Sequence, residues 1–557
     1  MDARVGAAAD RAKTVHNIVA GVPVAGLLVP EAVAYAGIAG LAPQHAVVAS
    51  VAGLLAYACI GSSRYAIVTP TSSSAAILAA AVATLSASGL AATETVVLTG
   101  ALVLIVGILF ALASAARLGH LAAFISRPVL RGFAFGLAIT IVVKQLPHIA
   151  GVQVTGGPAQ VLLQLGQQFL SWNSWSLGLG GLAYLCLRVF KRVPYLPVAF
   201  VVMALGILAA IRLDLPAHGV QPVGAIDLTG LHFQWPALGR DAWLRAGELA
   251  IPLFIILYAE SWGSIRALAL RHGDPVDANR ELAGLGFANL VSGALQGMPV
   301  GAGFSGSSAN EEAGASGKAA GLVAAGAIVL LMLVASQWLA LLPQPVLAAV
   351  VISALTHALD PRPLLALWRL GRDEALATCA VLAVIVLGVL HGMMLAVLLS
   401  IVAAVRRFSQ SRVAVLGDLE GTRDYVEVAR HPSAVERAGV LVVRPEQPLF
   451  FANAERSLAG VRTLLDTRAD VQVLVLSLEE SVDLDSTALE ALAEFSAWIT
   501  RSHRGLVLAR VKEDVRELLQ RAAVEGPATP CYWSVADAVA AASANLMPEP
   551  GRIRPPV

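Results

Sequence analysis

Two serine-rich stretches interrupt the hydrophobic pattern of this chain in the same way. One reads YAIVTPTSSSAAILAAAVA from Tyr65, and the other reads GMPVGAGFSGSSANEEAGASG from Gly297. Each has a short extended run, a proline, and then the hydroxyl residues that commonly begin helices, where backbone N–H groups point outward. The positive end of the helix dipole adds to these N–H groups. A pair of such helix ends predicts a site for an anion.

Either stretch alone has a simpler interpretation, because small residues also let helices pack closely in a membrane. However, backbone that is not helical at membrane depth is tolerated only where it is buried in protein or lines a cavity. Two interrupted helices in corresponding halves of a chain are typical of the central site of inverted-repeat transporters. The pair therefore favours a binding site over packing alone.

Two carboxylates lie inside apolar segments, Glu31 in VPEAVAYAGIAGLAP and Glu260 in LYAESWGS. A carboxylate at membrane depth is protonated, paired or facing water. Two roles are open: coupling to a proton or cation, or a structural pair with Lys144 or a loop arginine. Lys144 itself is expected to extend to the interface, and Glu311 and Glu312 are expected to be solvated on the cytoplasmic side.

The elements that carry these residues are apolar and of helix-spanning length. Of 557 residues, 57% are hydrophobic and 14% are charged, against about 25% charged in a soluble domain, so lipid must cover much of the surface. Fourteen apolar segments lie at 16–39, 46–60, 71–88, 94–115, 122–148, 176–190, 196–211, 248–270, 281–296, 304–313, 318–341, 345–358, 375–391 and 392–406. Several are too short to cross roughly 30 Å of hydrocarbon, which predicts broken helices.

Basic residues fall on alternate turns between these segments, and this sets the orientation. They are Arg64, then Arg117, Arg127 and Arg131, then Arg188, Lys191 and Arg192, then Arg362, Arg369 and Arg372. With fourteen spans, these turns and both termini are expected to be cytoplasmic. The expected location is the cell inner (plasma) membrane.

Composition excludes several other classes of protein. The net charge of +1 gives no footprint for nucleic acid, and nothing matches the phosphate-binding loop of nucleotide hydrolases. The four cysteines and the scattered histidines show no metal-ligand spacing. We therefore expect no cofactor, no metal site and no enzymatic activity.

The composition changes after Arg407. Strand patterns at 440–445 and 471–478 alternate with helical stretches at 453–466, 486–501 and 511–523, which predicts a small α/β domain. This domain is expected to cover 408–545, on the cytoplasmic side. The proline-rich tail, 546–557, is expected to be disordered.

Four ordered stretches resemble the SulP family of sulfate permeases and related anion transporters. They are VPEAVAYAGIAGLAP, GSSRYAIVTPTSSSAA, RLGHLAAFISRPVLRGFAFGLAI from Arg117, and HGDPVDANRELAGLGFANLVSGALQGMPVGAGFS from His272. The soluble part resembles a STAS domain, the module shared by sulfate transporters and anti-sigma-factor antagonists, through LVLSLEESVDLDSTALEALAEF. Ser486 takes the place of the serine that the antagonists phosphorylate. It is either a regulatory site or, with Asp485, the start of a helix.

The resemblance implies a uracil-permease-type fold with 14 spans in a seven-plus-seven inverted repeat. Spans 1–4 and 8–11 would form a mobile core (about 16–115 and 248–341). The other spans would form a gate that also makes a homodimer (about 122–211 and 345–406). The transport domain would cover 1–407.

The resemblance also carries over a substrate site between the third and tenth spans. Its residues would be Pro70, Thr71, Ser72, Gly303, Phe304, Ser305 and Gly306, with Glu31 and Glu260 as coupling residues. Many family members have Ser-Arg-Ser or Ser-Arg-Thr where this chain has Ser305, Gly306 and Ser307. The missing positive charge weakens the case for tight binding of a divalent anion and favours a monovalent anion, or a substrate that enters with a proton.

These patterns lead to one expected function and two alternatives. The expected function is secondary active transport of sulfate, bicarbonate or a small carboxylate, with elevator-like movement and coupling to H⁺, to Na⁺ or to anion exchange. A nucleobase:cation symporter shares the fold but lacks a STAS domain. A channel or membrane-anchored signalling protein would use the STAS domain but would not need the paired helix ends.

Overall fold

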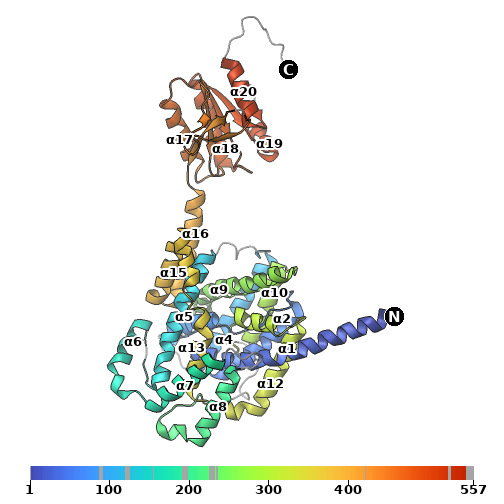
Figure 1. The fold of residues 1–557 in the computed structure, drawn as a ribbon, viewed down its shortest axis with the longest axis vertical. Coiled ribbons are helices and arrows are strands. Elements are labelled where there is room, and N and C mark those ends of the chain that lie inside the picture. Colours follow the sequence, from blue (N-terminus) through green and yellow to red (C-terminus); the bar gives the residue numbers. More distant parts are fainter. Residues whose placement is uncertain are drawn as a thin grey trace. The chain divides into compact units, whose positions relative to one another are not determined.

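The computed structural model describes residues 2–86, 92–119, 126–154, 156–190, 198–224, 233, 236, 238–420, 422–522, 524 and 529–546. The chain divides into two compact units, residues 1–401 and 402–557. The first unit is helical, and the second unit is the α/β domain (Figure 1). Most of the tail at 546–557 and the basic pair Lys191 and Arg192 lie outside the described residues.

Each of the fourteen apolar segments corresponds to a helix over most of its described residues, and two further helices join them. The helices are α1 (Asp2–Ala39), α2 (Pro43–Ile60), α3 (Ser72–Ser86), α4 (Ala92–Ala115), α5 (Arg127–Ala150), α6 (Pro158–Gln167), α7 (Ser174–Phe190), α8 (Val198–Arg212), α9 (Arg240–His272), α10 (Ala278–Ala294), α11 (Phe304–Glu312), α12 (Ala319–Leu339), α13 (Gln344–Ala354), α14 (Arg362–Leu370), α15 (Glu374–Leu387) and α16 (Val389–Phe408). Short 3₁₀ turns lie at Phe169–Ser171, Leu215–His218 and Leu355–His357. In the described part of the chain, seven helices are long and apolar enough to cross a membrane.

The apolar pattern missed α6 and α14 and placed the start of α9 eight residues late, at 248 instead of Arg240. The first turns of α9 carry Arg240 and Asp241, so the helix continues beyond the apolar run that marks the span. α14 buries Leu367 and ends in a turn that carries Arg369. Such a short amphipathic helix is not found by a search for long apolar segments.

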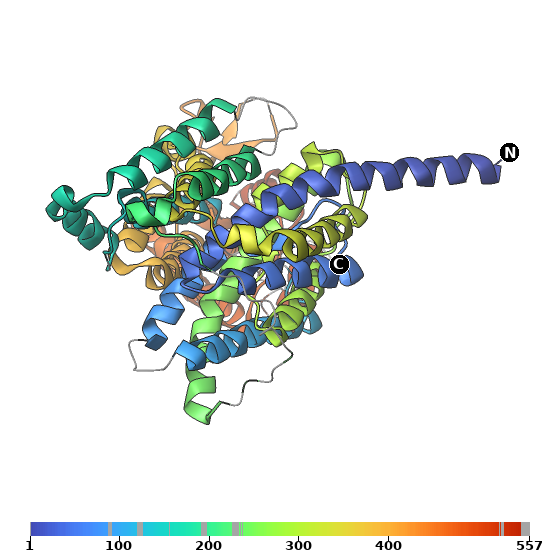
Figure 2. The same ribbon diagram turned by 90° about the horizontal axis from the view of Figure 1, so that it is seen from below.

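The helices of the first unit pack in two groups (Figures 1 and 2). One group contains α1–α4 with α9–α12, and the other contains α5, α7, α8, α13 and α15. Close approach in the first group depends on small residues, as is usual between membrane helices. A Cβ on Gly293 of α10 would lie 2.8 Å from the backbone N of Leu104 on α4. The groups meet where α1 contacts α8 and α13, and where α3 contacts α5.

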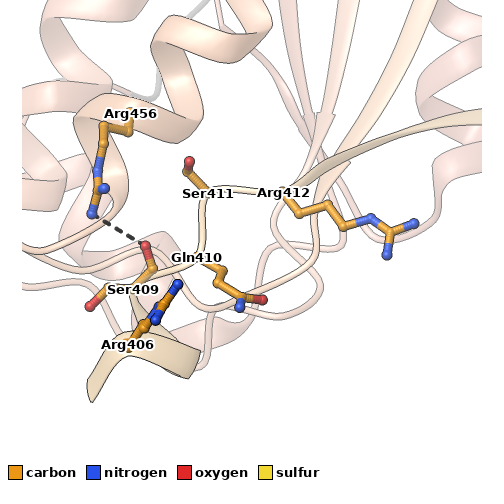
Figure 3. A pocket seen from close by; sticks show the side chains of 6 residues that line it. All are labelled: Arg406, Ser409, Gln410, Ser411, Arg412 and Arg456. Carbon is orange, nitrogen blue, oxygen red and sulfur yellow. Dashed lines mark hydrogen bonds between the residues drawn. The ribbon is translucent and has the colours of Figure 1, made fainter. Parts of the chain in front are cut away.

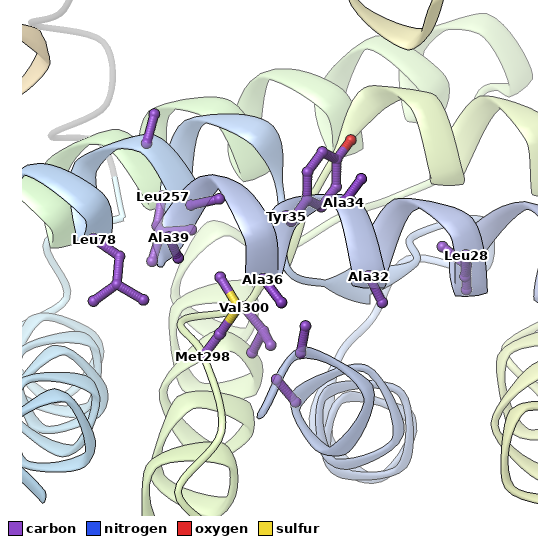
Figure 4. Packing of buried hydrophobic residues seen from close by; sticks show 14 of the residues in the cluster. Leu28, Ala32, Ala34, Tyr35, Ala36, Ala39, Leu78, Leu257, Met298 and Val300 are labelled. Carbon is purple, nitrogen blue, oxygen red and sulfur yellow. The ribbon is translucent and has the colours of Figure 1, made fainter. Parts of the chain in front are cut away.

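The two serine-rich stretches meet in the middle of the first group. Strands β1 (Val68–Thr69) and β2 (Gly301–Ala302) pair antiparallel, with Val68 opposite Ala302. Each strand leads directly into a helix, α3 or α11. The strands are buried below α1, and Figure 4 shows Ala36 of α1 near Met298 and Val300. The structure therefore has the paired broken helices that the sequence predicted.

The second unit is a mixed sheet with helices on both faces. Its strands are β3 (Val413–Leu419), β4 (Tyr425–Glu427), β5 (Ala434–Val435), β6 (Val440–Pro445), β7 (Val473–Ser477), β8 (Gly505–Ala509) and β9 (Cys531–Tyr532). The order is β4-β3-β6-β7-β8-β9, with β6 to β9 parallel and β5 beside β3. Successive side chains along each strand point to opposite faces of the sheet, and both faces are buried. Helices α17 (Ala454–Asp466), α18 (Ser486–Arg501) and α19 (Glu513–Arg521) cover one, and α20 (Val535–Leu546) covers the other.

Candidate functional site

The starts of α3 and α11 lie against each other. A Cβ on Gly303, the residue before α11, would lie 3.2 Å from Cγ2 of Thr71, the residue before α3. Thr71 begins α3 with a reciprocal cap, because Oγ1 of Thr71 accepts from the backbone N of Ser74, and Oγ of Ser74 accepts from the backbone N of Thr71. Two helix N-termini with their N–H groups therefore face one small region.

Glu260 of α9 is bound by the first of these helices. Oγ1 of Thr71 donates to Oε2 of Glu260 over 3.0 Å, and Oγ of Ser73 donates to the same oxygen over 2.6 Å. The carboxylate thus accepts two hydroxyl groups from the start of α3.

Glu31 of α1 is bound by the second helix. Oγ of Ser305 donates to Oε1 of Glu31 over 2.9 Å. The arrangement is crossed, because each carboxylate belongs to one half of the unit and accepts from the half-helix of the other half. The partners of both carboxylates are hydroxyl groups, so the alternative pairing of Glu31 or Glu260 with Lys144 or a loop arginine is wrong for the described residues.

Access to this region is from the α11 side. Phe304 is 51% exposed and Ser305 is also exposed, whereas Glu31 is only 7% exposed and Thr71 is buried. A solute would therefore meet Phe304 and the hydroxyl of Ser305 before it reached the carboxylates.

The other residues carried over from the family resemblance lie around this centre. Pro70 is buried and Ser72 is half-buried. Gly306 is buried too, and a Cβ there would lie 3.1 Å from Cγ2 of Ile67 and 3.5 Å from Cδ2 of Leu28. A larger side chain at position 306 would require Ile67 and Leu28 to move. The helix start is therefore packed closely around the glycine that stands where many family members have arginine.

Several residues hold the strand backbone in a role that the sequence did not predict. Oγ of Ser261 accepts from the backbone N of Ala302, and Oγ of Ser307 accepts from the backbone N of Ile67. Asn289 of α10 is buried and holds Val300 twice, accepting from its N–H and donating to its carbonyl. These hydrogen bonds satisfy backbone N–H and carbonyl groups in and beside the strands that the short β1–β2 pairing does not satisfy. Their residue types are common in close-packed helices, and only the fold brings them to the strands.

Another buried carboxylate lies beside the C-terminal end of α2. Glu281 of α10 is buried and accepts hydrogen bonds from the hydroxyls of Tyr57 and Ser62 and from the backbone N of Ser62 and Ser63. The turn before β1 is thus tied to α10, and so the position of β1 depends on Glu281.

Glu311 is not solvated as expected. Oε2 of Glu311 lies 2.7 Å from Nη1 of Arg271, and Oε1 lies 2.6 Å from Nε2 of His272. Its side chain is 10% exposed. The expectation for Glu311 is therefore wrong, because α11 ends beside the last turn of α9, whereas Glu312 is exposed as expected.

A hollow of about 260 Å³ lies where the two helix groups meet. It is lined on one side by Val33, Ala34 and Gly37, within two turns after Glu31 on α1, and on the other by Gln145 and His148 of α5 and Gln344 of α13. Nδ1 of His148 lies 3.2 Å from Oε1 of Gln344. Within the described residues, no group of three His, Cys, Asp or Glu side chains could hold a metal ion.

In the second unit, Ser486 is the exposed first residue of α18. Asp485 precedes it, and its two oxygens accept from the backbone N of Ala488 over 2.8 Å and from that of Phe451 over 2.7 Å. Asp485 therefore caps the helix and fixes the neighbouring loop, and the hydroxyl of Ser486 stays accessible.

The fold and the paired helix ends define a membrane transporter of the inverted-repeat class, and comparison with known proteins gives the family. The sulfate permease family model matches residues 15–381, and the STAS domain model matches residues 431–538. This chain belongs to the sulfate permease family and carries a C-terminal STAS domain. The "Probable sulfate transporter" of Mycobacterium tuberculosis is 35% identical over 532 residues, which cover 91% of each chain. "Sulfate transporter 4.1, chloroplastic" of Arabidopsis thaliana is 28% identical, covering 91% of this chain and 76% of its own.

Solved structures share the fold. The murine Solute Carrier 26 family member A9 anion transporter, in its inward-facing state, superposes with a TM-score of 0.87 at 21% identity, covering 95% of this chain and 92% of that one. The transmembrane domain of a cyanobacterium bicarbonate transporter, BicA, superposes with a TM-score of 0.60 at 21% identity, covering 70% and 97%. The predicted fold, a helical membrane domain followed by a STAS domain, is confirmed. The relatives are named as transporters and not as enzymes.

Proposed function

We propose that this chain is a secondary active transporter that binds a small anion between the starts of α3 and α11 and couples its passage to protons. The observation that carries the proposal is the crossed pair of hydrogen bonds, Ser305 to Glu31 and Thr71 with Ser73 to Glu260. Helix N-termini attract anions. Carboxylates beside such a site favour the anion when they are protonated and repel it when they are ionised. A proton and an anion would thus enter together.

The substrate class follows from the charges at the site. With glycine at 306, the attraction rests on two helix ends and on hydroxyl groups, each helix end contributing about 0.3–2 kcal/mol. This favours bicarbonate or a small carboxylate, or sulfate entering with protons. Relatives named as sulfate transporters support sulfate as a candidate, and the structural neighbour named as a bicarbonate transporter supports bicarbonate.

The movement we propose is an elevator-like displacement of α1–α4 with α9–α12 against the remaining membrane helices. It is supported by the packing of the helices in two groups with a hollow at their junction. We also propose a homodimer in the cell inner (plasma) membrane with both termini cytoplasmic, and Na⁺ coupling or anion exchange as the alternatives to proton coupling.

Uptake by the purified protein in liposomes tests the proposal. Radiolabelled sulfate, bicarbonate and fumarate are offered with an inward proton gradient, with an inward Na⁺ gradient and with neither. Accumulation of one anion that depends on the proton gradient is expected. Uptake of uracil in place of all three anions would favour the nucleobase symporter, and no uptake of any solute would favour a membrane anchor.

A further inference from the structure

Arginine side chains surround a hollow where α16 ends and the fold of the second unit begins (Figure 3). The hollow has a volume of about 570 Å³ and is lined by Arg406, Ser409, Gln410, Ser411, Arg412 and Arg456. All six residues belong to the unit 402–557. The lining combines three cations with two hydroxyl groups and contains no carboxylate.

The backbone around the hollow is fixed by side chains of the STAS domain. Asn453, which is 1% exposed, donates through Nδ2 to the carbonyl of Phe408, the last residue of α16. Nη2 of Arg456 donates to the carbonyls of Ser409 and Ala452. The short segment after α16 is therefore held against the start of α17, and Arg456 is fixed beside Ser409.

Two of the arginines keep N–H groups for a ligand. In the described part of the chain Arg406 makes no hydrogen bond or ion pair, and Arg456 uses only Nη2 for its two backbone bonds. Arg412 is partly neutralised, because its Nη2 lies 2.8 Å from Oε1 of Glu427. Figure 3 shows Arg406 and Arg456 on either side of Ser409, with Arg412 pointing away from them.

The chemistry of this lining suits a phosphate group. Guanidinium groups bind phosphate oxygens through paired N–H donors, and hydroxyl groups can add further hydrogen bonds. The apolar run of α16 ends at Val405 and the arginines follow at once. Basic residues that directly follow a span lie at the membrane–water interface, among lipid headgroups, and clusters of them attract acidic lipids. We propose that the hollow binds the phosphate group of an acidic phospholipid.

Native mass spectrometry of the full-length protein in detergent tests this site. Three probes are titrated: dioctanoyl phosphatidylglycerol, dioctanoyl phosphatidylcholine and inorganic phosphate. The variant is Arg406→Gln, whose exposed side chain has no partner to lose. The matched control is Arg407→Gln, which removes the same charge one residue away and does not line the hollow. Gel filtration of each variant checks that it is folded.

We expect phosphatidylglycerol to bind in preference to phosphatidylcholine. Arg406→Gln should raise the phosphatidylglycerol concentration for half occupancy by roughly fivefold, and Arg407→Gln by less than about twofold. Equal effects of the two substitutions, or equal binding of the two lipids, would overturn the site. Binding of inorganic phosphate that is sensitive to Arg406→Gln, without binding of phosphatidylglycerol, would overturn the lipid as its source.

Discussion

Ser305 and Glu31 join the two halves of the membrane unit, because the hydroxyl is on α11, the carboxylate is on α1, and they are 2.9 Å apart. Thr71 and Ser73 make the corresponding connection from α3 to Glu260. An ionised carboxylate only accepts hydrogen bonds, whereas a protonated one can also donate. Protonation of Glu31 or Glu260 therefore changes the hydrogen bonds of the neighbouring hydroxyl groups, which an incoming anion meets. This links proton binding to anion binding through named atoms.

Substitution of Glu31 by glutamine tests that link. The amide keeps an oxygen that can accept from Ser305 but does not titrate. Uptake driven by an inward proton gradient should fall to the level without a gradient, while exchange of internal for external anion is retained. Glu312→Gln, which changes an exposed carboxylate at the end of α11, is the control and should keep its response to the gradient. An unchanged pH dependence in the Glu31 variant would exclude Glu31 as the coupling residue.

Removal of the Ser305 hydroxyl should weaken anion binding. Hydrogen bonds to charged groups are worth about 1.5–3 kcal/mol, so Ser305→Ala should raise the half-saturating anion concentration about tenfold or more. Ser308→Ala is the matched control on α11, since in the described chain the buried Oγ of Ser308 has no partner. It should change uptake by less than about twofold. Equal losses in both variants would mean that the effect is structural.

Sequence patterns were sufficient for most of the membrane helices and for the two broken helices. Apolar runs located the membrane helices, since their length follows from the thickness of the bilayer. The prolines and hydroxyl residues around Pro70 and Ser305 located the broken helices. Non-helical backbone at membrane depth is tolerated only where it is buried in protein or lines a cavity.

The partners of the site residues could not be predicted. The crossed pairing of Glu31 and Glu260 depends on how α1 and α9 lie against the opposite half-helices, and no local pattern carries that information. Ser73 illustrates this limit, because its neighbours Thr71 and Ser72 were expected to bind substrate, yet Ser73 makes the shorter bond to Glu260, at 2.6 Å. Asn289 and Glu281 were missed for the same reason, since Glu281 binds backbone far away in the sequence and Asn289 binds the extended backbone that follows its own helix.

Glu281 should be essential for the stability of the membrane unit. Glu281→Ala leaves four donors without their acceptor, and each buried donor left unsatisfied costs about 1–3 kcal/mol. Tyr57→Phe removes one donor and leaves the carboxylate its other bonds, so it should cost only about 1 kcal/mol. Thermal unfolding in detergent, followed by gel filtration, compares the two variants. Equal melting temperatures would show that the turn before β1 is held by other contacts.

The α20 side of the STAS domain should lose stability in acid. A hydrogen bond from Ser534 and the nearby Arg423 guanidinium hold the pKa of Asp537 below its usual value of 3.8. Since the folded pKa is the lower one, the stabilisation is present above the unfolded pKa and is lost as the pH falls through the folded pKa. Hydrogen exchange in α20, corrected for intrinsic rates, should therefore distinguish the native chain from Asp537→Asn at pH 6. The difference should shrink as the pH falls below 3.8, and a difference that grew there would contradict the assignment.

Asp485 and Ser486, adjacent at the start of α18, should differ in their response to substitution. Asp485→Ala removes the acceptor of the Ala488 and Phe451 amides, and loss of a helix cap costs about 0.5–2 kcal/mol. Ser486→Ala removes only an exposed hydroxyl. In the full-length protein, the amide hydrogens of Ala488 and Phe451 should therefore exchange faster in Asp485→Ala. Their exchange rates should be unchanged in Ser486→Ala. A negative charge at 486 should, if anything, slow exchange in the first turn, because it lies at the positive end of the helix dipole. If Ser486→Ala alone exposed these amides, Ser486 and not Asp485 would be the cap, and a modification of this serine would then act by unfolding the helix start.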